Sequence, residues 1–250
     1  MIEIQKLHKS FGSQIVLNDL NLSIPKGKIT VIIGRSGEGK SVFIKHLMGL
    51  IRPDSGKVII DGTSLFDLNQ YQLNDIRKRF GMLFQYAALF DSMTVYENIA
   101  FPIKEHTNKS LKEVTNDVHE LIDLVGLSKI TLPKFPSELS GGMRKRVGLA
   151  RAIALKPEIL LYDEPTTGLD PVMTDVVNHL ILNTQKTLGI TSVVISHDIQ
   201  ATYDIADKIA MLHEGKILLE GDTQTFKNTK NIVVKNFLNG NASPEQLKEI

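Results

Sequence analysis

The chain has 250 residues, a formal net charge of +1 at pH 7 and no cysteine. Without cysteine there is no disulfide, thiolate metal site or cysteine nucleophile, and the nearly neutral charge gives no sign of nucleic acid as a partner. The apolar runs are far shorter than the roughly 18 residues of a membrane span, and the first residues lack the layout of a signal peptide. We therefore expect a soluble chain, which leaves docking on a membrane protein open.

The first part of the chain is expected to form strands and one helix. Alternation of apolar and polar residues predicts β-structure within residues 2–24. A short β-branched run bounded by glycine predicts a strand at 28–33 that is buried on both faces. A glycine-rich loop then leads into an apolar-periodic helix at about 40–50, and turn residues at 52–56 precede another strand, KVIIDG.

Residues 86–137 differ from the rest because they are rich in helix formers, with a helix expected at 111–126. We interpret this stretch as a mostly helical insertion between two parts of an α/β core. Strands that alternate with helices after it favour a largely parallel sheet. The expected elements there are helices at 142–155, 171–187 and 199–206, strands at 159–162 and 191–195, and a β-hairpin around 213–216.

The glycine-rich loop matches the pattern G-x-x-x-x-G-K-[ST] at every fixed position. Glycines let successive backbone N–H groups point at phosphate oxygens, and the N-terminus of the following helix adds partial positive charge. Lys40 would place a cation against the β- and γ-phosphates, and the Ser41 hydroxyl can ligate Mg²⁺. A chance glycine-rich turn is the alternative, and the flanking strand and helix disfavour it. The candidate ATP-binding residues are Gly34, Arg35, Ser36, Gly37, Glu38, Gly39, Lys40, Ser41 and Val42.

An acidic pair, Asp163 and Glu164, follows the apolar residues Ile159–Tyr162. Carboxylates at the C-terminal edge of a strand lie where ligands bind in open α/β sheets. Asp163 can hold Mg²⁺ through water, and Glu164 can orient or deprotonate an attacking water. Alone, the pair would be a plain polar strand end, but a complete phosphate loop upstream favours the catalytic interpretation.

Four more stretches occur in order: MLFQ ending at Gln85, LSGGM from Leu139, GLD ending at Asp170, and SHD around His197. Together with the two nucleotide motifs, they make residues 1 to about 222 resemble the ATP-binding-cassette (ABC) ATPases. The resemblance implies an α/β P-loop NTPase core with a mostly parallel sheet and an N-terminal antiparallel β subdomain. It also implies a helical subdomain at about 86–155, an ABC ATPase domain at 1–222 and a C-terminal extension at 223–250.

Cassette ATPases work as head-to-tail pairs with two ATP molecules between them, and the resemblance assigns roles accordingly. Phe11 matches the aromatic residue that stacks on adenine, although tyrosine is commoner there. Gln85 matches the glutamine that contacts Mg²⁺ and the attacking water, and Asp170 matches the loop that contacts the opposite subunit. His197 matches the histidine that contacts the γ-phosphate. Without the SHD context, a satisfied core histidine would be the better interpretation of His197.

The turn before the helix at 142–155 carries the signature sequence. Ser140 is a good N-cap, and Gly141 and Gly142 let the backbone approach another molecule closely. In a head-to-tail dimer the N–H groups here would face the γ-phosphate held by the other subunit. Met143 replaces the commoner glutamine at a position where no phosphate chemistry requires a side-chain donor. The basic run 144–146 is expected to be a solvated helix face.

Three classes of cassette protein remain open: a transporter ATPase subunit, a soluble cassette protein, and an interaction subunit with little hydrolysis. The single cassette and the complete set of catalytic residues favour the transporter subunit. The stretches ALFDSMTVYENIAFP and PSELSGGM are similar to the MCE-linked (Mla/Mkl-type) phospholipid transport ATPases. An importer ATPase for a polar solute, such as an amino acid, is the alternative.

This resemblance implies ATP and Mg²⁺ as cofactors and several protein partners, but no nucleic acid. The partners are a second copy of the chain, a transmembrane permease, an MCE-domain substrate-binding protein and a possible small accessory subunit. It also places the chain on the cytoplasmic face of the inner membrane as a peripheral subunit. Phe237 and Leu238, in an amphipathic piece of the C-terminal extension, are expected to pack on the second copy or on an accessory protein. A frayed terminus is the alternative for that extension.

Overall fold

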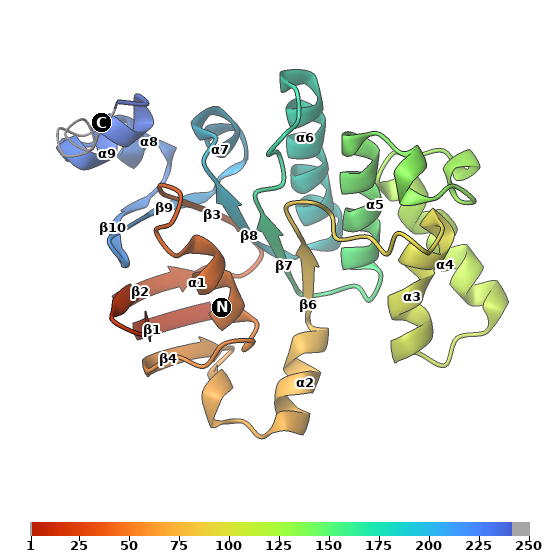
Figure 1. The fold of residues 1–250 in the computed structure, drawn as a ribbon, viewed down its shortest axis with the longest axis horizontal. Coiled ribbons are helices and arrows are strands. Elements are labelled where there is room, and N and C mark those ends of the chain that lie inside the picture. The colour runs from red at the N-terminus through yellow and green to blue at the C-terminus, as the bar shows by residue number, and fades with distance from the viewer. Residues whose placement is uncertain (1, 242–250) are drawn as a thin grey trace. The chain divides into compact units, whose positions relative to one another are not determined.

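The computed structural model describes residues 2–241 (Figure 1). The chain divides into two compact units. Unit 1 combines residues 1–73 with residues 195–250, and unit 2 is the continuous stretch 74–194. The chain therefore leaves unit 1 once and returns to it. Among residues 2–241, no helix is both long enough and apolar enough to cross a membrane.

Unit 1 contains a four-stranded antiparallel sheet in the order β2–β1–β4–β5. Ile4 of β1 pairs with Leu22 of β2 on one side and with Val58 of β4 on the other, and all three side chains are buried. Such a sheet is stabilised because the apolar residues that alternate along each strand are buried on one face. The β-structure predicted within residues 2–24 is confirmed. The four strands are β1 (Ile2–Phe11), β2 (Gln14–Ile24), β4 (Ser55–Ile60) and β5 (Thr63–Ser64).

A second group of strands in unit 1 supports the phosphate loop. β3 (Ile29–Ile33) is buried along its whole length, as predicted, and pairs in parallel with β9 (Lys208–His213). β9 turns back into the antiparallel β10 (Lys216–Gly221), which confirms the predicted hairpin. The helical elements that begin in this unit are α1 (Lys40–Leu47), η1 (Leu65–Asp67), α2 (Gln70–Lys78), α7 (Ile199–Ile205), α8 (Thr223–Lys227) and α9 (Ile232–Leu238).

Unit 2 contains the parallel pair β6 (Phe80–Leu83) and β7 (Ile159–Asp163), together with the first residues of β8 (Thr191–Ser196). A Cβ at Gly81 of β6 would lie 2.2 Å from the carbonyl oxygen of Ala152, so only glycine lets α5 pack this close to the strand. The helical elements of unit 2 are α3 (Val95–His106), α4 (Leu111–Leu124), η2 (Lys129–Thr131), η3 (Pro136–Glu138), α5 (Gly141–Ile153) and α6 (Pro171–Leu188).

Two capping boxes fix the starts of the helices that precede α5 in the chain. Thr94 and Glu97 begin α3, and Ser110 and Glu113 begin α4, each pair exchanging side-chain and backbone hydrogen bonds. Gly126, with a φ of 67°, lies just beyond the end of α4. These helices confirm the predicted helical character of residues 86–137, and Figure 1 shows α3 and α4 next to α5.

The C-terminal segment begins with two short helices, α8 and α9. Phe226 of α8 and Val234 of α9 are fully buried, whereas Ile232 is 66% exposed. Phe237 and Leu238, which were predicted to pack on a partner, are half-buried in this single chain. The remainder of the predicted extension, residues 242–250, lies outside the described residues.

Candidate functional site

The phosphate loop, residues 34–41, connects β3 to α1 in unit 1. Gly34 has a φ of 156°, and a Cβ there would lie 2.5 Å from the carbonyl oxygen of Leu212 in β9. Gly39 has a φ of 95°, and its Cβ would lie 2.8 Å from Cγ1 of Val16. Both glycines are therefore required by backbone conformation and by close neighbours in the same unit.

Lys40 is the first residue of α1 and is only 6% exposed. Its ammonium donates to the carbonyl oxygens of Gly34 at 2.8 Å and Arg35 at 2.7 Å, so the charge lies inside the curve of the loop. Gly39, the N-cap residue, provides no side-chain acceptor for the first turn, and the Ser41 hydroxyl belongs to an exposed residue. The start of α1 therefore offers backbone donors, a cation and a hydroxyl to an anion.

Glu38, at a variable position of the loop pattern, connects the loop to the β9–β10 hairpin through hydrogen bonds. Nδ1 of His213 lies 3.0 Å from Glu38 Oε1, and the backbone N–H of Glu214 donates to Oε2. No local pattern predicts this contact, since Glu38 and His213 are 175 positions apart. Through these contacts the side chain of Glu38 helps to hold the loop in place.

Phe11 and His197 also belong to unit 1, and both are exposed. The Phe11 ring is 48% exposed at the end of β1, and the ammonium of Lys9 lies 5.4 Å from its centroid. An exposed aromatic face is what stacking on a planar base requires. His197 follows β8 directly, and Asp198 then caps α7. Because His197 is exposed, the alternative of a core histidine is wrong.

In unit 2, the structure brings Gln85 and Glu164 into contact. β6 and β7 run in parallel with Leu83 opposite Tyr162, so the residues that follow both strands lie at one edge. Gln85 Nε2 donates to Glu164 Oε2 at 3.2 Å, and Thr167 Oγ1 donates to the same oxygen at 3.0 Å. One carboxylate oxygen of Glu164 is thereby held in a defined orientation.

The backbone of Glu164 adopts an uncommon conformation. Its φ is 48°, in the left-handed region that glutamate rarely occupies. Such strain persists only where surrounding contacts impose it, and it is common at functional sites. Asp163, the last residue of β7, is half-buried beside it. Asp163 thus ends the buried strand and Glu164 follows it, as expected from the sequence.

The signature turn begins α5. Ser140 Oγ accepts a hydrogen bond from the Met143 N–H at 3.3 Å, which confirms the predicted N-cap. A Cβ on Gly142 would lie 2.2 Å from Cε of Met173, so this glycine makes room for a side chain of the same chain. A Cβ on Gly141 would meet only Leu169, at 3.7 Å. Gly141 and the exposed Ser140 therefore form the open part of the turn.

Asp170, which was expected to contact the opposite subunit, also caps α6 within its own chain. Its carboxylate accepts from the Met173 N–H at 2.9 Å and caps α6, and Pro171 is the first residue of that helix. An aspartate directly before a proline is typical of a helix start, so the pair Asp170–Pro171 could have predicted this N-cap from the sequence. The residue remains exposed, so the cap leaves its surface accessible.

Lys145 contradicts the expectation that residues 144–146 form a solvated helix face. It is 6% exposed, and its ammonium donates to the backbone carbonyl oxygens of Gln85 and, at 3.3 Å, Glu164. Burial lowers the pKa of Lys145 to about 8, and the negative charges of Glu164 and Asp163 oppose that shift. The prediction failed because one position of a charged run turns toward the interior of unit 2.

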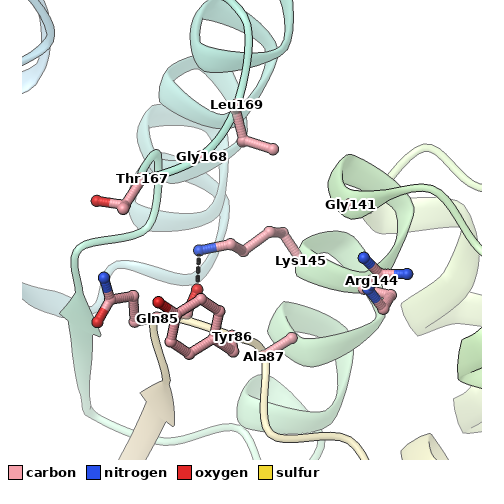
Figure 2. Close-up of a pocket in the computed structure, with 9 residues that line it drawn as sticks. All are labelled: Gln85, Tyr86, Ala87, Gly141, Arg144, Lys145, Thr167, Gly168 and Leu169. Carbon is pink, nitrogen blue, oxygen red and sulfur yellow. Dashed lines mark hydrogen bonds between the residues drawn. The ribbon is translucent and has the colours of Figure 1, made fainter.

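These segments of unit 2 line a pocket of about 340 Å³. Figure 2 shows the side chain of Lys145 crossing it from α5 toward Gln85, with Thr167 on the opposite side. The lining combines the loop after β6, the first two turns of α5 and the loop before α6. Its residues are Gln85, Tyr86, Ala87, Gly141, Arg144, Lys145, Thr167, Gly168 and Leu169.

The candidate Mg²⁺ ligands can be tested against the chemistry of the donors. Among the described residues, no group of three or more His, Cys, Asp or Glu side chains could hold a metal ion. Mg²⁺ usually takes one or two protein oxygens and completes its shell with water and substrate phosphates. The Ser41 hydroxyl of unit 1 is an oxygen donor of this kind, as are the Gln85 amide oxygen and the Asp163 carboxylate of unit 2. The chemistry of each of these groups fits a nucleotide-bound ion.

Comparison with known proteins places the chain in a family. The ABC transporter family model matches residues 17–167. The chain is 45% identical over 239 residues to the probable ribonucleotide transport ATP-binding protein mkl of Mycobacterium tuberculosis, covering 96% of this chain but only 66% of that protein. It is 39% identical over 240 residues to the intermembrane phospholipid transport system ATP-binding protein MlaF of Haemophilus influenzae, covering 96% of this chain and 90% of MlaF.

Solved structures agree with this assignment. The ATP-binding cassette MJ0796, in a dimeric post-hydrolysis state bound to ADP and Pi, is 30% identical, with a TM-score of 0.81 over 89% of this chain and 98% of that chain. The cbiO1 protein of Clostridium perfringens is 28% identical, with a TM-score of 0.84 over 100% of this chain and 98% of that chain. The matches confirm the predicted cassette fold, the resemblance to Mla/Mkl-type proteins and the ATPase class. The chain belongs to the ABC transporter family.

Proposed function

We propose that the chain is the ATP-hydrolysing subunit of a membrane transporter that moves phospholipid. The contact between Gln85 Nε2 and Glu164 Oε2 carries the hydrolytic part of the proposal. It pairs a carboxylate base with an amide at the edge where two parallel strands end, which is where α/β sheets bind ligands. A plain polar strand end would not need Glu164 to adopt a strained backbone.

The assigned roles follow from what phosphoryl transfer requires, which is mainly positioning and charge stabilisation. Lys40 and the amides of the phosphate loop bind the β- and γ-phosphates. Ser41, Gln85 and Asp163 would hold Mg²⁺, with Asp163 acting through water. Mg²⁺ neutralises charge on the phosphates when it is bound. Glu164 accepts a proton from the attacking water. His197 contacts the γ-phosphate, and Phe11 stacks on the adenine.

We further propose that each complete site needs two copies of the chain. Ser140 and Gly141 are accessible at the N-terminus of α5, a helix of 13 residues, and such an end attracts anions. In a head-to-tail homodimer these groups and Gly142 would face the γ-phosphate bound by the partner's loop, and Asp170 would lie at the contact between copies. The dimeric state of the related cassette MJ0796 supports this arrangement.

Several exposed aromatic side chains of unit 2 suit a membrane partner. Phe90 and Phe101 pack edge to face at 5.1 Å, Arg151 lies over Phe90, and Tyr86 and Phe135 are exposed in the same unit. Exposed aromatic residues of this kind are typical of protein interfaces. We propose that they receive a helix of a permease, which would place the chain as a peripheral subunit on the cytoplasmic face of the inner membrane.

The names of the relatives favour two cargoes. MlaF proteins are named for phospholipid transport, and the mycobacterial relatives for ribonucleotide transport. The sequence around ALFDSMTVYENIAFP supports the phospholipid system, in which an MCE-domain protein and a small accessory subunit would complete the complex. Import of a polar solute is the second candidate, and the ribonucleotide name favours it.

Purification of the intact complex from its native membrane tests the transport proposal. We expect the chain to bring down a permease, an MCE-domain protein and bound phospholipid, identified by mass spectrometry. Tyr86→Asp should lose the permease, whereas Tyr71→Asp should retain it, because Tyr71 is an equally exposed tyrosine in α2. Recovery of a soluble solute-binding protein without lipid would support the polar-solute alternative and overturn the lipid proposal.

A further inference from the structure

Lys145 is a buried ammonium in the second turn of α5, and its position lacks an explanation in the roles above. It is 6% exposed. Burying an ammonium raises the free energy of the folded chain unless hydrogen bonds compensate for the lost water. The hydrogen-bond partners of Lys145 therefore indicate its role. Because burying this ammonium is unfavourable, we expect the lysine to have a specific role in unit 2.

Both hydrogen bonds of Lys145 go to backbone atoms of the hydrolytic residues. The ammonium donates to the carbonyl oxygen of Gln85, in the loop after β6 (Figure 2), and to that of Glu164, after β7. The side chains of these two residues are themselves joined through Gln85 Nε2 and Glu164 Oε2, 3.2 Å apart. One cation therefore closes a small network that links two loops to the signature helix.

The geometry at Glu164 shows why such a network is needed. Its φ of 48° is unfavourable for a residue with a side chain, and the carbonyl of the same residue is one of the acceptors of Lys145. Thr167 orients the carboxylate but does not reach the backbone of Gln85. Lys145 alone, among the hydrogen bonds described for this site, contacts the backbone of both residues.

We propose that Lys145 is a positioning residue that sets the Gln85–Glu164 pair relative to the signature helix. Its ammonium holds both loop backbones so that the two side chains keep their contact and the start of α5 keeps its place beside them. The inference rests on the proposed ATPase function, because positioning matters only if Gln85 and Glu164 act on water. It predicts that losing Lys145 slows hydrolysis without weakening nucleotide binding by the loop of residues 34–41.

The test compares Lys145→Met with Lys145→Arg in the full-length chain. Lys145→Met should lower kcat roughly 10- to 100-fold, as expected for removing a residue that orients catalytic groups, with KM for ATP unchanged. Lys145→Arg keeps the charge and the donors and should recover most of kcat. Lys112→Met, the same change at an exposed lysine of α4, is the matched control and should leave kcat unchanged.

A double-mutant cycle with Gln85→Ala separates positioning from a merely structural effect. If Lys145 acts through Gln85, Lys145→Met should cost much less in the Gln85→Ala background than in the wild type. Additive losses would overturn the proposal, as would a Lys145→Met chain with normal kcat. If Lys145→Met does not fold, a Lys145→Arg chain that folds but stays as slow as Gln85→Ala also counts against it. Absent hydrolysis in the wild-type chain would instead refute the proposed function.

Discussion

Glu164→Gln is expected to abolish most ATP hydrolysis while leaving ATP binding intact. The amide cannot accept the proton of the attacking water, and loss of a positioned general base costs roughly 100-fold or more in turnover. The change keeps the shape of the side chain and a hydrogen-bond acceptor for Gln85 and Thr167, which both donate to Glu164 Oε2. The loop proposed to bind nucleotide, residues 34–41, belongs to unit 1 and is not altered.

Phosphate release measures the loss of hydrolysis, and titration calorimetry measures ATP affinity. Size-exclusion chromatography with ATP should show the Glu164→Gln chain accumulating as an ATP-bound dimer, because the nucleotide that joins the copies is not consumed. Glu158→Gln is the matched control, since Glu158 precedes the other end of β7 and forms an exposed pair with Arg79. Normal hydrolysis in Glu164→Gln would contradict the assignment of the base.

Lys40→Ala is expected to weaken ATP binding by roughly 10- to 100-fold, the effect of losing hydrogen bonds from a charged donor. The ammonium of Lys40 already lies inside the loop, bonded to the carbonyl oxygens of Gly34 and Arg35. An incoming triphosphate would offer it stronger, negatively charged acceptors. Removing the ammonium leaves both the phosphates and the two carbonyls without that donor.

Titration calorimetry with ATP checks this expectation, and thermal unfolding shows whether the loop survives the change. Lys45→Ala provides the control, because Lys45 is an exposed lysine on the same helix, and its ATP affinity should equal that of the wild type. A folded Lys40→Ala chain with unchanged affinity would rule out the phosphate-binding role of this loop.

Local patterns were sufficient to predict most elements of the fold. The glycines of the phosphate loop, the buried strand before it and the helix after it are neighbours in sequence, so their pattern alone carried the prediction. The N-cap Ser140 and the carboxylates at the end of β7 could also be predicted, because each lies within a short local pattern. α2 was missed because it is a short, mostly polar helix: Tyr71, Leu73 and Ile76 are its only apolar side chains, and none of its residues is buried.

Contacts between distant positions could not be predicted from a single sequence. Glu38 meets His213 across 175 positions, and Lys145 meets Gln85 across 60. No periodicity marks such pairs, because they depend on which loops the sheet brings together. Gly142 shows a related limit: its motif suggested close approach to another molecule, but not that Met173 of the same chain lies where a Cβ would be.

The central claim is that each site combines the phosphate loop of one copy with the signature turn of the other, and mixing two inactive variants tests it most directly. Lys40→Ala disables the loop. Gly141→Asp places a negative charge where the partner's γ-phosphate would lie, at a position where a Cβ meets only Leu169 at 3.7 Å and acidic residues suit a helix start. Each variant alone should be nearly inactive at an ATP concentration far below the Kd of the Lys40→Ala chain.

Mixed in equal amounts, half of the dimers contain one chain of each kind, and each mixed dimer has one complete site out of two. We therefore expect the mixture to recover about a quarter of wild-type ATP hydrolysis, provided the two sites act independently. The rate of phosphate release from the mixture is the deciding measurement. A mixture as inactive as its two components would contradict the account, because it would show that the loop and the signature turn act within one chain.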